Sequence, residues 1–170
     1  MFSPASPETL GRTAGLPLTR GVEQPVTVGT FDERTGYMLG LGTEMVVKGN
    51  LSVEVNAIYK PFRVDESQEN YQGSFAVLTW QFPVLAKYRW VRAGWTPFVA
   101  AGPSFRLAGN LNGYNPSHIG ATVEAGVDRI AHGFRLSPAL RYTRWASDPS
   151  DNRYSRTKSD AVEIVFGVSF

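Results

Sequence analysis

The sequence contains no cysteine, only two histidines and no long apolar run among its 170 residues. Without cysteine there is no disulfide, no thiolate metal site and no thiol nucleophile. A membrane-spanning helix needs about 20 consecutive apolar residues, so the sequence predicts none. The formal net charge is only +2 and no basic run stands out, which argues against nucleic acid as a partner.

A signal peptide is also not visible. Residues 1–7 have neither the basic segment nor the apolar segment that such a peptide requires. An outer-membrane protein needs one, so either it has been removed, the start is truncated, or the protein does not reach that membrane. We expect a single domain over residues 1–170, with residues 1–10 as a flexible N-terminal segment.

What the sequence has instead is alternation of apolar and polar residues with a period of two, which is typical of strands. At the end of the chain, one face carries Val162, Ile164, Phe166, Val168 and Phe170. Since successive side chains of a strand point to opposite faces, these five form one apolar stripe. Comparable stripes occur over residues 51–60, 80–90, 119–128 and 134–144, and weaker ones over 11–18, 37–47 and 96–107. We therefore predict eight strands.

The links between these strands alternate in length. Short turns are expected at residues 48–50, 91–95 and 131–133, where Gly and Asn supply the positive φ angles of tight hairpins. Longer polar links are expected at 19–36, 61–73, 108–118 and 146–160. An even strand number with short turns at one end and long loops at the other indicates an all-β, eight-stranded antiparallel up-and-down transmembrane β-barrel.

The polar face suggests which side of the barrel is the lumen. Small residues such as Gly, Ala and Ser are interleaved there with charged ones of both signs, which suits the narrow lumen of an eight-stranded barrel. Lys60 lies on this face, and we expect a lumenal charge network of Glu44, Glu54, Lys87, Arg89, Arg106, Glu124, Arg135, Arg141 and Glu163. Buried charges need partners, so ion pairs that plug the lumen are favoured over a charged pore lining.

Aromatic residues make up 12% of the chain, and their positions agree with a lipid-facing apolar stripe. Tyr88, Trp90 and Phe170 fall near the short-turn end, and Tyr59, Trp80 and Tyr142 toward the other end. Two aromatic belts are expected where a barrel crosses both membrane interfaces.

Few residues suggest catalysis or metal binding. His132 is expected to be a turn residue, and His118, beside Ser117, a surface-loop residue rather than a catalytic one. The aspartates at 148, 151 and 160 match no calcium-loop spacing. We expect no cofactor, no metal and no catalytic residue.

Several segments resemble the outer membrane protein β-barrel domain families of Gram-negative bacteria, the small porin-like or PorT-like barrels. The resemblance spans nearly the whole chain and is most specific at WQFPVLAKYRW (residues 80–90) and PFVAAGPS (97–104). GLPLT (15–19), LSPALRYT (136–143) and the terminal FGVSF also fit. The resemblance implies a bacterial outer-membrane barrel with both ends periplasmic. It also implies that Phe166, Val168 and Phe170 form the signal for the barrel-assembly machinery.

The sequence thus predicts a non-enzymatic outer-membrane barrel with a structural or interaction role in its outer loops. Its expected partners are outer-membrane lipid, the assembly machinery and an unidentified loop ligand. A narrow outer-membrane channel is the first alternative. A soluble, lipocalin-like barrel with a hydrophobic ligand and a lipid-modifying enzyme are further ones.

Overall fold

A computed structural model describes residues 9–17, 30–34, 37–68, 71–92, 94–110, 117–147 and 159–169. These residues are almost entirely strand. The elements are β1 (Thr9–Pro17), β2 (Thr30–Arg34), β3 (Met38–Lys48), β4 (Leu51–Gln68), β5 (Tyr71–Arg89), β6 (Trp95–Asn110), β7 (Ile119–Ala131), β8 (Phe134–Trp145) and β9 (Asp160–Ser169). Within this part of the chain, no helix is long and apolar enough to span a membrane.

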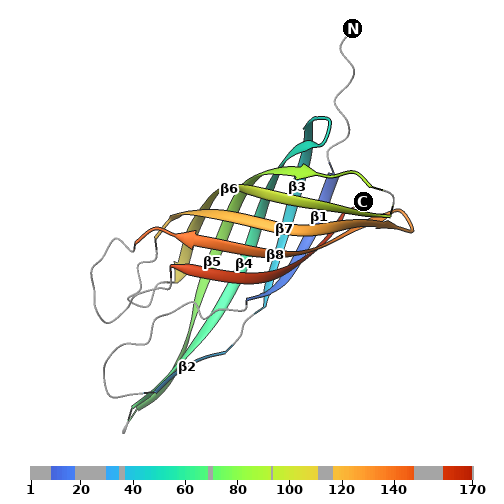
Figure 1. Cartoon of the computed structure of the whole chain (residues 1–170). Coiled ribbons are helices and arrows are strands. Elements are labelled where there is room, and N and C mark those ends of the chain that lie inside the picture. Colours follow the sequence, from blue (N-terminus) through green and yellow to red (C-terminus); the bar gives the residue numbers. More distant parts are fainter. Residues whose placement is uncertain are drawn as a thin grey trace.

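The strands form one closed antiparallel sheet (Figure 1). Consecutive strands from β3 to β9 pair with one another, and β1 closes the ring by pairing with both β3 and β9. The short strand β2 pairs with residues 63–67 of β4, while β3 pairs with residues 51–59 of the same strand. Because β2 and β3 follow the same edge of β4, the barrel has eight strand positions. The predicted eight-stranded antiparallel barrel is confirmed.

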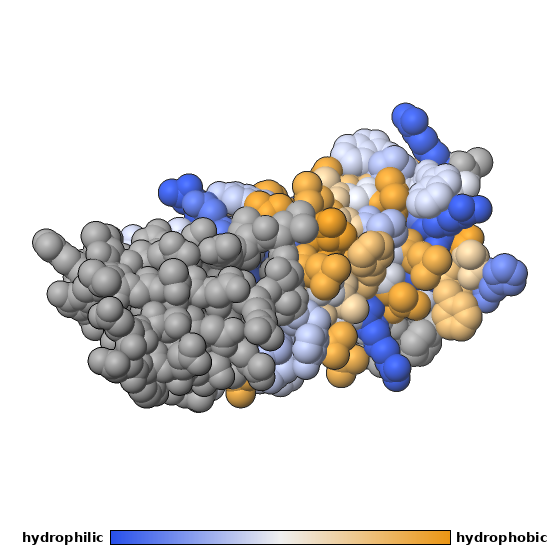
Figure 2. Space-filling model, turned by 90° about the horizontal axis from the view of Figure 1, so that it is seen from below, coloured by the Kyte–Doolittle hydropathy of each residue, from blue (hydrophilic) through white to orange (hydrophobic). Residues whose placement is uncertain are grey.

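Side-chain burial alternates along the wall and confirms the predicted faces. On β5, Gln81, Leu85 and Lys87 are buried, whereas Trp80 and Tyr88 are exposed. The apolar stripes therefore point outward, and hydrophobic side chains gather over the wall in the space-filling view (Figure 2). A polar interior with an apolar exterior is the arrangement of a membrane barrel. The lipocalin-like alternative, which requires the stripe inside, is wrong.

The three predicted short turns are confirmed by their backbone angles. Gly49, Gly94 and Gly133 have φ values of 57°, 91° and 84°. His132 has a φ of 53°, so it is a turn residue, as expected. Left-handed φ angles favour glycine because its missing Cβ removes the steric clash. All three turns lie at the same end of the antiparallel barrel.

The other end differs from the sequence prediction. Residues 61–73 were expected to be a loop, but β4 and β5 continue through most of this segment and pair as far as Gln68 and Tyr71. Likewise, 19–36 contains β2, and β6 extends to Asn110. The predictions were wrong because they required apolar alternation, whereas these extensions are held together by backbone pairing between strands.

At the N-terminal end of the chain, the first strand begins earlier than predicted. Thr9 and Leu10, assigned to a flexible segment, pair with β3 as the first residues of β1. Residues 1–8 and Phe170 lie outside the described residues. The single-domain assignment stays a prediction.

Candidate functional site: the ion-paired lumen

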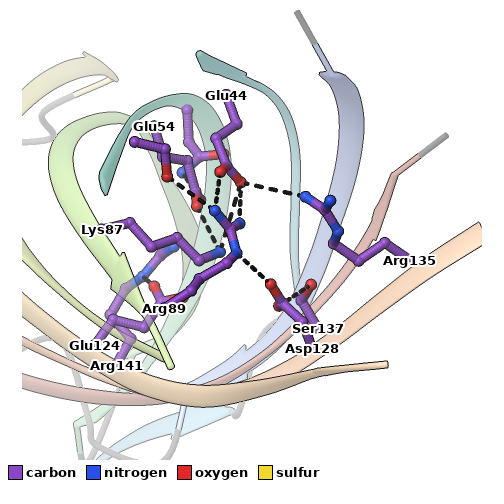
Figure 3. Close-up of polar contacts among 11 residues, drawn as sticks. Glu44, Glu54, Lys87, Arg89, Glu124, Asp128, Arg135, Ser137 and Arg141 are labelled. Carbon is purple, nitrogen blue, oxygen red and sulfur yellow. Dashed lines mark hydrogen bonds and ion pairs between the residues drawn. The ribbon is translucent and has the colours of Figure 1, made fainter. Parts of the chain in front are cut away.

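Arg89 on β5 is the centre of a charge cluster inside the short-turn half of the barrel (Figure 3). Its guanidinium nitrogens Nη1 and Nη2 donate to the two carboxylate oxygens of Glu44 on β3. Nε donates to Asp128 Oδ2 on β7 at 2.7 Å, and Nη1 also donates to Ser52 Oγ at 2.9 Å. One side chain thus connects three other strands across the lumen.

Neighbouring charges extend this cluster around the wall. Lys87 Nζ lies 3.0 Å from Glu54 Oε2 and 3.8 Å from Glu44 Oε2. Arg135 on β8 also contributes, and its Nη1 lies 3.9 Å from the same Glu44 oxygen. Glu54 also accepts a hydrogen bond of 2.7 Å from Asn56 Nδ2. Charge-assisted hydrogen bonds of this kind are stronger than neutral ones, so the cluster ties opposite walls together.

A second charged group lies closer to the middle of the barrel. Arg141 Nε donates to Glu124 Oε2 at 2.7 Å, between β8 and β7. Lys60 Nζ lies 2.9 Å from Glu163 Oε1, joining β4 to β9 across the lumen. Arg141 and Glu163 are both almost fully buried. Their Nη1 and Oε2 atoms have no hydrogen-bond partner in the described part of the chain.

Arg106 is the predicted network member that lies apart from both groups. It is buried near the long-loop end, where its guanidinium carbon lies 4.3 Å from the ring centroid of Trp145. Its Nε donates to the Ser117 carbonyl oxygen at 2.9 Å. The other eight predicted lumenal charges belong to the two groups described above.

Apolar side chains share the lumen with these charges. Leu85 is completely buried and Phe98 almost completely. Lys87 Nζ lies 3.8 Å from the centroid of the Phe98 ring. Gly126 lets the Phe98 ring pack against the wall, because a Cβ there would lie 2.7 Å from the ring. A cavity of about 50 Å³ remains beside the Glu44 cluster. That volume holds only a few water molecules.

Sequence reasoning missed several members of this site. Asp128, Ser52, Asn56 and Ser137 all lie in the cluster, and Ser137 Oγ donates to Asp128 Oδ1 at 2.7 Å. Asp128 occupies the polar face of its strand, and this signal could have identified it. The hydroxyls give no comparable signal, because Ser and Thr also occur on solvent-facing strands.

Of the residues considered for chemistry, the structure describes Ser117, His118, His132 and Asp160. His118 is exposed, and its Nδ1 lies 2.9 Å from the Arg106 carbonyl oxygen. Asp160 is exposed beside Arg144 and Tyr142, while Asp148 and Asp151 lie outside the described residues. Among residues that the structure describes, no three His, Cys, Asp or Glu side chains could hold a metal ion.

Comparison with solved structures finds the same fold in outer-membrane proteins. OprG from Pseudomonas aeruginosa superposes with a TM-score of 0.61 at 15% identity, covering 96% of this chain and 94% of OprG. Neisserial surface protein A gives a TM-score of 0.60 at 15% identity, with 95% and 94% of the two chains covered. AlkL, solved in lipid bilayers, gives 0.50 at 12% identity, covering 99% of this chain and 90% of AlkL. A search of curated proteins found no match.

The family comparison agrees with the fold. The sequence profile described as "Outer membrane protein beta-barrel domain" matches residues 9–144, from the first described strand to the end of β8. The segments that suggested this resemblance lie within that range, except the terminal FGVSF at residues 166–170, which follows it. The chain belongs to the outer membrane protein β-barrel domain family.

Proposed function

We propose that this protein is a plugged, non-enzymatic outer-membrane barrel that acts through the structure it presents beyond the membrane at its long-loop end. The observation that carries the proposal is the lumen, where ion pairs from facing strands meet around Arg89. A small ion that passed this level would have to displace these contacts. Only a few water molecules fit beside them.

The long-loop end offers the larger surface for interactions. A transmembrane strand needs about 9–11 residues, whereas β4 and β5 have 18 and 19. From Pro61 paired with Leu78 onward, the two strands continue as a hairpin with β2 along one edge. Figure 1 shows this hairpin extending well past the other strands. Because surface segments on a rigid scaffold often carry binding function, we place the interaction role here.

Planar-bilayer recording tests the plug. We expect the purified protein to show no steady conductance, and the double variant Glu44→Ala/Arg89→Ala to show one because it loses the central pair. The matched control is Arg144→Ala/Asp160→Ala, which removes an exposed pair at 3.5 Å. A steady conductance of the unmodified protein would contradict the plug and support the narrow channel.

Epitope tags test the direction in which the hairpin points. A tag inserted between Gln68 and Tyr71 should bind antibody on intact cells, because the long-loop end faces outward. A tag at the Gly49 turn should bind only after the outer membrane is permeabilised. The reverse pattern would refute the proposed interaction surface while leaving the plug unaffected.

A further inference from the structure

Arg12 places a positive charge on the lipid-facing surface of β1. Its neighbour Thr13 is only partly exposed, whereas Arg12 is exposed. Its partners in the two flanking strands are Leu41 of β3 and Val168 of β9, and both are exposed apolar residues. Within the described residues, Arg12 makes no hydrogen bond or ion pair. An arginine in this setting is unfavourable unless a polar group accompanies it.

A hollow of about 800 Å³ begins at Arg12 and crosses the outer wall from β9 to β5. Its lining is almost entirely apolar. Ala14 and Ala57 contribute small side chains, and Leu39, Trp80 and Phe166 contribute large ones. Leu39 lies directly opposite Ala14 in the ladder of β1 and β3. The hollow is therefore a depression in the surface that hydrocarbon chains would contact.

Along the barrel axis, Arg12 lies nearer the short-turn end and the hollow extends from it toward the long-loop end. Arg12 is near the start of β1, opposite Val168 at the end of β9, and both strand ends lie at the short-turn end. Trp80 and Tyr59, at the far side of the hollow, belong to the aromatic group toward the long-loop end, with ring centroids 5.3 Å apart. A phospholipid in the leaflet at the short-turn end has the same order, with phosphate near the surface and acyl chains toward the midplane.

We propose that Arg12 and this hollow form a binding site for one phospholipid molecule of that leaflet. The guanidinium donates hydrogen bonds to the phosphodiester oxygens, a planar geometry in which arginine is favoured over lysine. One acyl chain fills the depression above Ala14 and Ala57. The bound lipid thereby neutralises a charge that the described residues leave unpaired.

Native mass spectrometry of the delipidated protein in detergent tests this site with dioleoylphosphatidylglycerol. Dioleoylglycerol, which has the same chains without phosphate, should bind more weakly by about tenfold, the value of a charged hydrogen bond. Arg12→Gln should abolish the difference between the two lipids. Ala57→Trp should weaken both, because the new side chain occupies the hollow, and Ala14→Leu serves if that variant does not fold. Arg144→Gln removes an exposed arginine elsewhere and should change nothing.

Other occupants give different results. Unchanged phosphatidylglycerol binding by Arg12→Gln would overturn the proposal. A dimer of this protein that persists when lipid is added would also overturn it, because a second copy would then cover the hollow. Displacement by inorganic phosphate at equal concentration would show a simple anion site without an acyl-chain contribution. Stronger binding of purified lipopolysaccharide would assign the site to the opposite leaflet. Variants are compared only if their gel mobility shifts on heating, as a folded barrel requires.

Discussion

Replacement of Arg89 by alanine should destabilise the barrel more than any single change on its exterior. The substitution removes the closest cation from Glu44, which keeps Lys87 and Arg135 at 3.8 Å and 3.9 Å. It also leaves Asp128 with the hydroxyl of Ser137. Breaking a buried ion pair by removing one partner costs about 3–5 kcal/mol. The adjoining cavity admits water to the cluster, so we expect a loss of about 2–4 kcal/mol in the free energy of unfolding.

Urea-induced unfolding in detergent, followed by tryptophan fluorescence, measures this loss by linear extrapolation. The matched control is Arg129→Ala, whose guanidinium carbon lies 5.0 Å from the Trp95 ring on the exposed face. A cation–π contact at an exposed position contributes about 0.5–1 kcal/mol. Arg89→Ala should therefore lower the free energy of unfolding clearly more than Arg129→Ala does.

A double-mutant cycle separates the ion pair from simple loss of packing. Glu44→Ala/Arg89→Ala removes both members, so its loss should fall short of the sum of the two single losses by about 1–3 kcal/mol. Equal losses for Arg89→Ala and Arg129→Ala, or strict additivity in the cycle, would refute the view that this cluster holds the facing walls together.

Three further substitutions probe the wall, each by the same unfolding measurement. Gly102→Ala should lower the free energy of unfolding by about 1–3 kcal/mol, because its Cβ would lie 2.0 Å from the Val84 backbone oxygen. No loss would mean that the lumen is looser than the structure indicates. Val123→Arg puts a charge on the middle of the exposed face and should lower the free energy of unfolding by about 2–4 kcal/mol. Ile130→Arg, near a turn, should lower it by only about 0–1 kcal/mol. Equal effects would contradict the depth assigned to these positions. Gly133→Ala should lose about 1 kcal/mol from its φ of 84° alone, since nothing lies within 4 Å of the added carbon. A gain in stability would refute this.

The sequence sufficed for the face of each strand, because the membrane imposes a strict rule. A residue such as Leu140 must face lipid and Arg141 the lumen, so a period of two fixes the orientation of the whole wall. The structure confirms this orientation along β8, where Leu140 is exposed and Arg141 is buried.

Partners within the lumen could not be predicted, because they depend on how strands are staggered across the barrel. Lys60 and Glu163 are 103 residues apart and meet only in the closed sheet. The same stagger brings Asp128 to Arg89 and places Arg106 against Trp145. No local pattern contains this information.

The long hairpin of β4 and β5 was missed for a different reason. The segment after Lys60 alternates poorly between apolar and polar residues. Its strands are specified by backbone pairing, such as Asp65 opposite Ser74, and not by an apolar stripe.

The pairing of β1 with β9 also has a consequence for how the barrel forms. Gly11 lies opposite Ser169, so this seam joins residues from nearly opposite ends of the chain. Bringing such distant segments together costs chain entropy before any contact repays it, which makes folding slow. The wall cannot close until its last strand is available, and every earlier state exposes an unpaired edge. The chain therefore has to be kept from aggregating through edge pairing until the seam forms.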